Sequence, residues 1–243
     1  MRRTIIQVLI IIFLWQIVSG LFNPPEYLFP SLDKVFKNFI ELYDVYLINT
    51  LYTLFEIIVG FIIANILGLI IAIIVVYYPI FEDTITTLAM ILKTIPIIAI
   101  APLLVLWFGH GSGSKIAAVI ITCFIPVLIN VISDAKIKRK EYRSLSNLYD
   151  ITNFQEIIFI VLPSILPSLI SSFKISSTLA IVGALVSEFV SANKGLGYLI
   201  ISNYHSMNIA GVFVCIVLSS IMGLLIYNIC NCFERKVVFT DRI

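Results

Sequence analysis

Charged side chains are scarce in this sequence. Asp, Glu, Lys and Arg make up only 12% of its 243 residues, whereas they make up about a quarter of an ordinary soluble domain. Hydrophobic residues reach 60%, and the mean hydropathy is +1.07. This composition excludes an ordinary soluble domain and predicts a polytopic membrane protein.

Several motifs that carry chemistry are missing as well. No G-x-x-x-x-G-K-[ST] pattern occurs, and the glycine-rich segment 109–113 follows an apolar helix rather than a strand, so we predict no phosphate cradle. The four cysteines lie in or beside apolar runs without C-x-x-C spacing, which favours packing over a metal or redox site. Because the net charge is only +2 and the basic residues gather in a few loops, we expect no nucleic-acid-binding face.

Long apolar runs are what the sequence has instead. A helix needs roughly 20 apolar residues to cross the hydrocarbon core of a bilayer. We therefore predict an all-α fold with six transmembrane helices, at residues 4–22, 49–78, 84–108, 115–133, 164–190 and 207–233. The first run would also suit a secretory signal, but it is longer than a usual signal core and no soluble domain follows it, which favours a retained helix.

The predicted helices divide the chain into three parts. Residues 1–48 hold the first helix and an amphipathic stretch, 31–42, that suits the outer membrane surface. Residues 49–232 form a core of five transmembrane helices, interrupted by a polar segment at about 134–163. Residues 233–243 form a short charged tail.

The distribution of Lys and Arg predicts which way the protein faces. The polar stretch 134–167 alone carries five of the sixteen basic residues. Together with the two ends of the chain it accounts for ten, whereas the loops on the opposite side carry four. Because Lys and Arg beside membrane spans are retained on the cytoplasmic side, we predict that this stretch and both termini are cytoplasmic.

A few polar residues and a helix-breaking proline lie inside the predicted spans. A charge at mid-helix costs roughly 2.5 to 3.5 kcal/mol, so each needs a partner, a cavity or a place near the interface. Lys93 and Lys174 would satisfy the last condition by snorkelling. The candidates for a polar pathway are Glu56, Lys93, Pro96, Asn130, Lys174 and Glu188.

Two stripes of small residues run along the predicted helices. Small residues that recur every fourth position let another helix approach closely, and the first stripe consists of Gly60, Ala64, Gly68 and Ala72. The second consists of Ser168, Ser172, Ser176, Ala180, Ala184 and Glu188. It would either line a pathway or form a packing contact.

Ser171 and Lys174 match a serine–lysine nucleophile pattern. A buried Lys can act as a base toward Ser. Serines are common in this helix, however, and no second catalytic motif accompanies the pair, so a membrane-embedded hydrolase is the weakest of the functions considered.

Several strings together resemble one family. Residues 94–96, 101–103, 106–111 and 114–116 resemble the third-to-fourth span region of ABC-importer permeases of the nitrate, sulfonate and taurine type. Leu162-Pro163 and 166–167 resemble the end of that superfamily's cytoplasmic coupling loop, and residues 187–188 with 195–198 resemble the segment that follows. The similarity covers about residues 24 to 232 in one register.

The resemblance implies the type I importer architecture and a homodimer of six-span permease subunits in a prokaryotic cell membrane. It also implies two cytoplasmic ATPase subunits that bind ATP and Mg, an external solute-binding protein, and no cofactor bound by this chain. A loop helix around residues 141–156 would then transmit the closure of the ATPase. The implied coupling residues are Glu141, Arg143, Ser144, Leu145, Ser146, Asp150, Ile151, Thr152, Leu162 and Pro163.

Two regions of the chain, the coupling loop and the second predicted span, depart from the family pattern. Asp150 stands in place of the coupling-loop glycine, and residues 144–146 replace its Glu-Ala-Ala, which implies an altered turn. Glu56 stands where similar proteins usually carry a basic residue. A partner such as Lys93 or Lys174 would compensate the reversed charge.

The leading hypothesis is therefore the permease subunit of an ATP-driven importer, without catalytic activity of its own. The alternative is a stand-alone secondary transporter or channel, which would normally show inverted repeats or selectivity rings. For the importer, nitrate, sulfonates, taurine, bicarbonate and a vitamin precursor remain open as the solute.

Overall fold

The computed structural model describes residues 2–21, 24–149 and 151–240 of the chain. Within these ranges, the side chains of residues 2–9, 11–12, 143–148 and 236–240 are not described. Every regular element in the described part of the chain is helical. The α-helices are α1 (Arg2–Leu21), α2 (Leu32–Glu41), α3 (Tyr43–Tyr77), α4 (Glu82–Thr94), α5 (Ile97–Phe108), α6 (Ser112–Leu148), α7 (Asn153–Glu156), α8 (Leu162–Ser164), α9 (Leu166–Ser191), α10 (Leu196–His205) and α11 (Ile209–Thr240). A 3₁₀ turn, Pro79–Phe81, precedes α4, and a π-helical turn, Ile157–Val161, follows α7.

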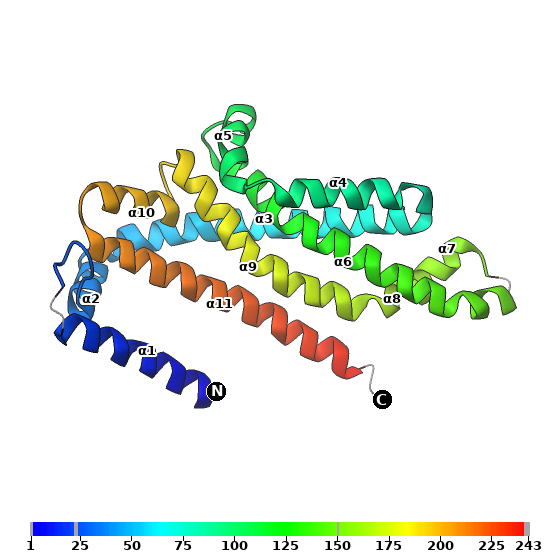
Figure 1. Cartoon of the computed structure of the whole chain (residues 1–243), viewed down its shortest axis with the longest axis horizontal. Coiled ribbons are helices and arrows are strands. Elements are labelled where there is room, and N and C mark those ends of the chain that lie inside the picture. The colour runs from blue at the N-terminus through cyan, green and yellow to red at the C-terminus, as the bar shows by residue number, and fades with distance from the viewer. Residues whose placement is uncertain (1, 22–23, 150, 241–243) are drawn as a thin grey trace.

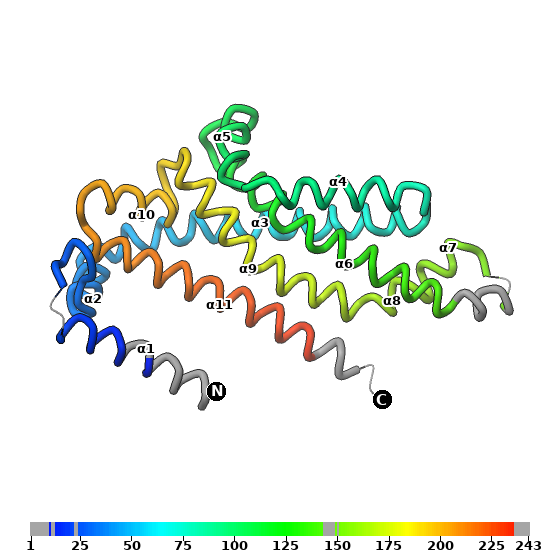
Figure 2. Tube along the Cα trace, viewed as in Figure 1, coloured from blue at the N-terminus to red at the C-terminus, as the bar shows by residue number. Residues whose placement is uncertain are grey.

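The long helices form an elongated bundle (Figure 1). Helices α3, α6 and α11 run in one direction along it, and α4 and α9 run in the other, as the trace in Figure 2 shows. Among the described residues, α3, α6, α9 and α11 each contain a stretch long and apolar enough to cross a membrane, and α4 with α5 counts as a fifth if the bent pair is one span. The all-α membrane architecture is confirmed, while the total of six spans stays a prediction.

Helix α3 packs closely on α6. Gly60 lies against Val119, where an added Cβ would come within 2.6 Å of the valine side chain, and Gly68 lies against Val127 at 3.1 Å. Ala64, which lies between these glycines in the sequence, and Ala72, one turn after Gly68, are fully buried, so the whole stripe of small residues faces the interior. Since helices in lipid gain contact by shape rather than by hydrophobic burial, this flat ridge fixes the centre of the bundle.

Helix α6 is longer than the sequence analysis predicted. It continues through residues 134–148, which had been assigned to a polar loop, and its 37 residues span about 55 Å at 1.5 Å per residue. Lys, Arg and Glu are good helix formers, and Lys138 pairs with Glu141 one turn later at 3.0 Å. The coupling segment is therefore not one helix over 141–156, because it is broken between Leu148 and Asn153.

The predicted third span is two helices. Helices α4 and α5 meet at an angle of 99°. Pro96 causes the break because a residue before proline avoids the helical region, and Ile95 is extended with φ −76° and ψ 122°. Pro102 lies inside α5 without ending it.

The bundle has two ends, which we name by their short helices (Figure 1). At the α10 end lie α2, which matches the amphipathic stretch 31–42, and α10, which falls between the predicted spans 164–190 and 207–233. Gly195, at φ 108°, starts α10. At the α7 end lie α7, α8 and the turn between α3 and α4. The apolar core has one cluster in each half, around Ile57, Val119 and Leu196 and around Val75, Val131 and Ile157.

Candidate functional site

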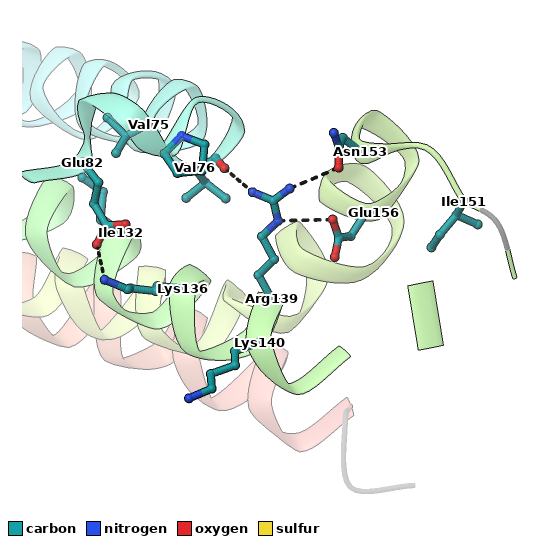
Figure 3. A pocket seen from close by; sticks show the side chains of 11 residues that line it. Val75, Val76, Glu82, Ile132, Lys136, Arg139, Lys140, Ile151, Asn153 and Glu156 are labelled. Atoms are coloured by element: carbon teal, nitrogen blue, oxygen red, sulfur yellow. Dashed lines mark hydrogen bonds and ion pairs between the residues drawn. The ribbon is translucent and has the colours of Figure 1, made fainter. Parts of the chain in front are cut away.

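A pocket of about 510 Å³ opens at the α7 end, between the end of α3, the start of α4, the last third of α6 and α7 (Figure 3). It is lined by Val75, Val76, Pro79, Glu82, Ile132, Lys136, Arg139, Lys140, Ile151, Asn153 and Glu156. Three of these residues are cationic and two are anionic. The pocket is thus a polar site on a chain with few charges.

Arg139 joins three elements at this pocket. Its guanidinium donates from Nε to Glu156 Oε2 at 3.2 Å and from Nη2 to Asn153 Oδ1 at 3.2 Å, both on α7. From Nη1 it donates to the carbonyl oxygen of Val76 at 2.8 Å, in the last turn of α3. A cation is favoured there because the carbonyl groups at a helix C-terminus are partly negative. One side chain of α6 therefore holds both α7 and the end of α3.

A second ion pair at the pocket joins α6 to α4. Lys136 Nζ lies 2.7 Å from Glu82 Oε1, which connects α6 to the first turn of α4. Lys140 is exposed and points away from the Arg139 contacts (Figure 3).

Helix α7 begins with a complete capping box. The backbone N–H of Gln155 donates to Thr152 Oγ1 at 3.4 Å, and the backbone N–H of Thr152 donates to Gln155 Oε1 at 2.9 Å. This satisfies two N–H groups that a helix start otherwise leaves unpaired. The cap and the Arg139 contacts hold this four-residue helix in place.

The structure places only part of the predicted coupling set at the pocket. Ile151 lines it and Thr152 caps α7, whereas Leu162 and Pro163 lie beyond the π-helical turn at the start of α8. Glu141 pairs with Lys138 on the surface of α6. Asp150 lies outside the described residues, and the side chains of Arg143, Ser144, Leu145 and Ser146 are not among those described. Arg139, Lys136 and Glu82 were not in the predicted set, since no local pattern relates the end of α6 to α3 and α4.

A buried polar cluster lies at the α10 end, around the loop that precedes α10. Glu188 Oε1 accepts a hydrogen bond from Thr53 Oγ1 at 2.7 Å, and its Oε2 accepts one from the backbone N–H of Gly197 at 2.5 Å. Asn49 and Thr53 accept the N–H groups of Gly195 and Leu196 at 2.7 and 2.8 Å. Side chains of α3 and α9 thus bind the first N–H groups of α10.

Lys115 completes this cluster. It is 1% exposed, and its ammonium donates to the carbonyl oxygens of His110 and Ser191 at 2.8 and 2.9 Å. Lys174 pairs with Glu234 instead, and Lys93 is exposed on α4, so the suggested partners of Glu56 are wrong. The sequence did not predict a buried role for Lys115, because a Lys at the start of an apolar run is typical of a loop beside a membrane span.

Lys174 has a different partner on α11. It forms an ion pair with Glu234, and Ser171 Oγ donates to the same carboxyl group at 3.2 Å. The Ser171–Lys174 pattern therefore joins α9 to α11 through Glu234. Lys93 lies exposed in the last turn of α4.

The serine-rich stripe of α9 is buried between helices. Ser176 Oγ donates to Asn65 Oδ1 of α3 at 3.3 Å, and Asn130 Nδ2 of α6 donates to Ser172 Oγ at 3.2 Å. Ala180 and Ala184 are fully buried. Of the two interpretations of this stripe, the structure favours packing within the subunit over a water-filled pathway.

Nothing in the described part of the chain groups three or more His, Cys, Asp or Glu side chains as a metal site would require. The site residues are instead cations and carboxylates that hold helix ends together.

Comparisons with known proteins agree with this description. A family model described as binding-protein-dependent transport system inner membrane component matches residues 64–239. The formylaminopyrimidine transport permease protein ThiX of Halalkalibacterium halodurans is 30% identical over 218 residues, which cover 89% of this chain and 87% of that protein. The nitrate import permease protein NrtB of Synechocystis is 24% identical over 180 residues, which cover 74% of this chain and 66% of that protein.

The fold is shared with a solved transporter. A structure of the MetNI methionine ABC transporter in an inward-facing conformation contains a chain with a TM-score of 0.70 at 18% identity, which covers 81% of this chain and 98% of that one. The family resemblance seen in the sequence is thus confirmed over most of the chain. The chain belongs to the binding-protein-dependent transport system inner membrane components, and it is the membrane-spanning permease subunit of an ABC importer whose ATPase is a separate subunit.

Proposed function

We propose that the α7 end of the permease faces the cytoplasm of a prokaryotic cell and is where the ATPase subunit docks. The observation that carries this proposal is the three-way contact of Arg139 with α7 and the end of α3. A subunit that presses on the capped α7 moves Arg139, and with it α3 and α6. The concentration of basic residues in this part of the chain supports the cytoplasmic orientation.

Two copies of the permease form the transporter in this proposal, and an external binding protein delivers the solute at the α10 end. In one copy, α4 and α5 expose large apolar side chains, among them Met90, Ile98 and Trp107. These side chains suit contact with a second subunit or with lipid. Alternating access then arises from relative movement of the two copies when their ATPases close.

We propose a small organic solute, with pyrimidine-type heterocycles as the first class to test. The support is the similarity to the formylaminopyrimidine permease over nearly the whole chain. The cations Lys115 and Lys174 are both bound by groups of the protein itself, so neither is available to an anionic solute such as nitrate or a sulfonate. Calorimetry with the binding protein encoded beside this permease tests the class directly, and binding of nitrate or sulfonates without heterocycles would refute it.

The docking proposal is tested by co-purification with the ATPase subunit. Arg139→Gln removes the charge that holds α7, and we expect a loss of about tenfold in the affinity of the permease for the ATPase subunit, within the usual range of coupling energies. Lys37→Gln is the control, because Lys37 is an exposed cation on α2 at the opposite end, paired only with Glu41. Equal effects of the two variants would contradict the assignment of the α7 end.

A further inference from the structure

The pocket at the α7 end lies where the apolar part of the bundle gives way to its charged end. The apolar run of α3 ends at Tyr77, and the acidic pair Glu82 and Asp83 begins α4 after the connecting turn. On α6, the buried Ile132 lines the pocket one turn before Lys136, which lines it too. Both helices thus change from apolar to charged beside this pocket, which places it at the level of the lipid headgroups.

The turn between α3 and α4 has the composition of a membrane interface. Tyr77 and Tyr78 pack edge to face, with their ring centroids 4.7 Å apart, and tyrosine rings are enriched at headgroup level. Ile80 and Phe81 follow in the 3₁₀ turn and are 84% and 52% exposed, as suits side chains that enter the lipid surface. Pro79 of the same turn lines the pocket, so lipid at this turn lies next to the pocket.

The charges in the pocket leave one cation over. Arg139 binds Glu156, and Lys136 binds Glu82, so each of the two carboxylates has a cation of its own. Lys140 forms no hydrogen bond or ion pair with any other residue whose side chain is described. An ammonium group has three donors, and Lys136, whose side chain is 66% exposed, uses one of them on Glu82. The pocket therefore has a surplus of positive charge and of hydrogen-bond donors.

We propose that this pocket binds the phosphate group of an anionic phospholipid from the cytoplasmic leaflet. Lys136 and Lys140 lie one turn apart on α6, and their ammonium groups point away from α7 (Figure 3). Because residues four apart share one face of a helix, a phosphate group between them accepts hydrogen bonds from both. The volume of about 510 Å³ suits a small polar headgroup, and Val75 and Ile132 give it an apolar wall for the glycerol end.

A lipid is favoured over other phosphates by the position of the site. Basic pockets between membrane helices on the cytoplasmic side bind anionic headgroups, and that leaflet is the one that carries a negative surface potential. The proposal shares with the proposed function only the cytoplasmic position of the α7 end. The ATPase contact is assigned to α7, whereas Lys136 and Lys140 face away from it. A bound headgroup would add to the link between α6 and α4 that Lys136 makes through Glu82.

Native mass spectrometry of the purified full-length permease tests the proposal, because it counts bound lipids and gives their dissociation constants. The permease is titrated with phosphatidylglycerol, which is anionic, and with phosphatidylcholine of the same acyl chains, which is zwitterionic. A basic residue beside anionic lipid contributes about fivefold in affinity, so two should favour phosphatidylglycerol by about 25-fold. Equal affinities for the two lipids would overturn the proposal.

Two variants with opposite expected effects locate the site. Lys140→Gln removes the unpaired cation without breaking an ion pair and should lower the affinity for phosphatidylglycerol about fivefold. Glu82→Gln removes the carboxylate that competes for Lys136 and should raise the affinity, which a merely loosened pocket would not do. A fall in affinity for Glu82→Gln would contradict binding at Lys136.

Lys138→Gln is the matched control. Lys138 lies on the same helix at nearly the same height, but it is outside the pocket and pairs with Glu141, so its loss should leave the affinity nearly unchanged. Equal losses for Lys138→Gln and Lys140→Gln would mean that the helix attracts anionic lipid only by its overall charge, and they would refute a built site.

Inorganic phosphate distinguishes a lipid site from a site for free phosphate. An excess of inorganic phosphate should displace little phosphatidylglycerol, because the free ion lacks the acyl chains that keep the lipid at this level. Complete displacement would overturn the lipid as the ligand. The ATPase is absent from every measurement, so a failure here leaves the docking proposal intact, and a permease that binds the lipid but recruits no ATPase would refute docking alone.

Discussion

At the scale of single residues, the loop before α10 depends on two glycines. Gly195 adopts φ 108°, a left-handed conformation that glycine reaches without steric cost. Gly197 lies directly over Glu188, and an added Cβ would come within 2.7 Å of the Glu188 Cβ and 2.8 Å of the Leu185 carbonyl oxygen. The backbone at Gly197 therefore approaches α9 closely enough for its N–H group to reach Glu188.

Gly197→Ala should destabilise the protein by about 1 to 3 kcal/mol, the usual cost of overpacking a well-packed site. The expected result is a lower midpoint of thermal unfolding in detergent. Gly111→Ala is the matched control, because nothing lies within 4 Å of a Cβ at Gly111. An unchanged midpoint for Gly197→Ala would show that the loop can move away from Glu188 at little cost.

The buried cluster also shows what sequence reasoning misses at this scale. Glu56 and Glu188 were predicted to need partners because charge is costly in a membrane. The identity of the partner did not follow, because positions 56, 115 and 188 meet only through the packing of α3, α6 and α9. Hydropathy predicts each helix separately and does not indicate which face of one helix packs against which face of another.

At the scale of elements, N-terminal caps distinguish the short helices α2 and α7. Thr152 and Gln155 form reciprocal hydrogen bonds at the start of α7. Ser31 stands at the start of α2 but makes no side-chain hydrogen bond there. A hydroxyl residue thus stands at the N-cap of both helices, but its side chain forms a capping hydrogen bond only in α7.

Thr152→Ala should weaken α7 by about 0.5 to 2 kcal/mol, which hydrogen–deuterium exchange of peptides covering residues 151–161 would detect as faster exchange. Ser31→Ala should leave the exchange of α2 nearly unchanged. If both variants behave alike, the capping box does not stabilise α7.

A charge swap tests the contact between α9 and α11. Lys174→Glu places a carboxylate beside Glu234 and should lower the unfolding midpoint, because side chains that are only 19% and 23% exposed are poorly screened. The double variant Lys174→Glu with Glu234→Lys should recover most of the loss. The same swap at Lys37 and Glu41, which are 76% and 59% exposed, should have little effect. Failure of the double variant to recover stability would contradict a direct ion pair.

At the scale of the whole molecule, apolar runs located the main helices, and the α3, α6, α9 and α11 spans lie near their predicted positions. Helix ends were less accurate. Hydropathy alone ends α6 where its charged continuation begins, although Lys, Arg and Glu extend helices well in water. The break at Pro96 was foreseen as a kink, but its size depends on the packing of α5 against α6 and α9, which no local pattern contains.

The orientation of the whole molecule can be checked by labelling single cysteines in intact cells. Lys140→Cys, at the α7 end, should be labelled only after the membrane is made permeable, and Lys194→Cys, at the α10 end, should react in intact cells. Both positions are exposed, and the exposed Cys232 is replaced by Ser in the background. The reverse labelling pattern would mean that the α7 end faces the outside of the cell, and it would contradict docking of the ATPase there.

The sharp bend at Pro96 has a consequence for how the bundle is covered. Helix α4 has 13 residues and rises about 20 Å, about two-thirds of a hydrocarbon layer of roughly 30 Å. Helix α5 then turns aside, as Figure 1 shows. Beside α4, the flank of α3 and α6 is therefore sheltered over only part of the membrane's depth. Above that height, acyl chains or another polypeptide must supply the missing van der Waals contacts.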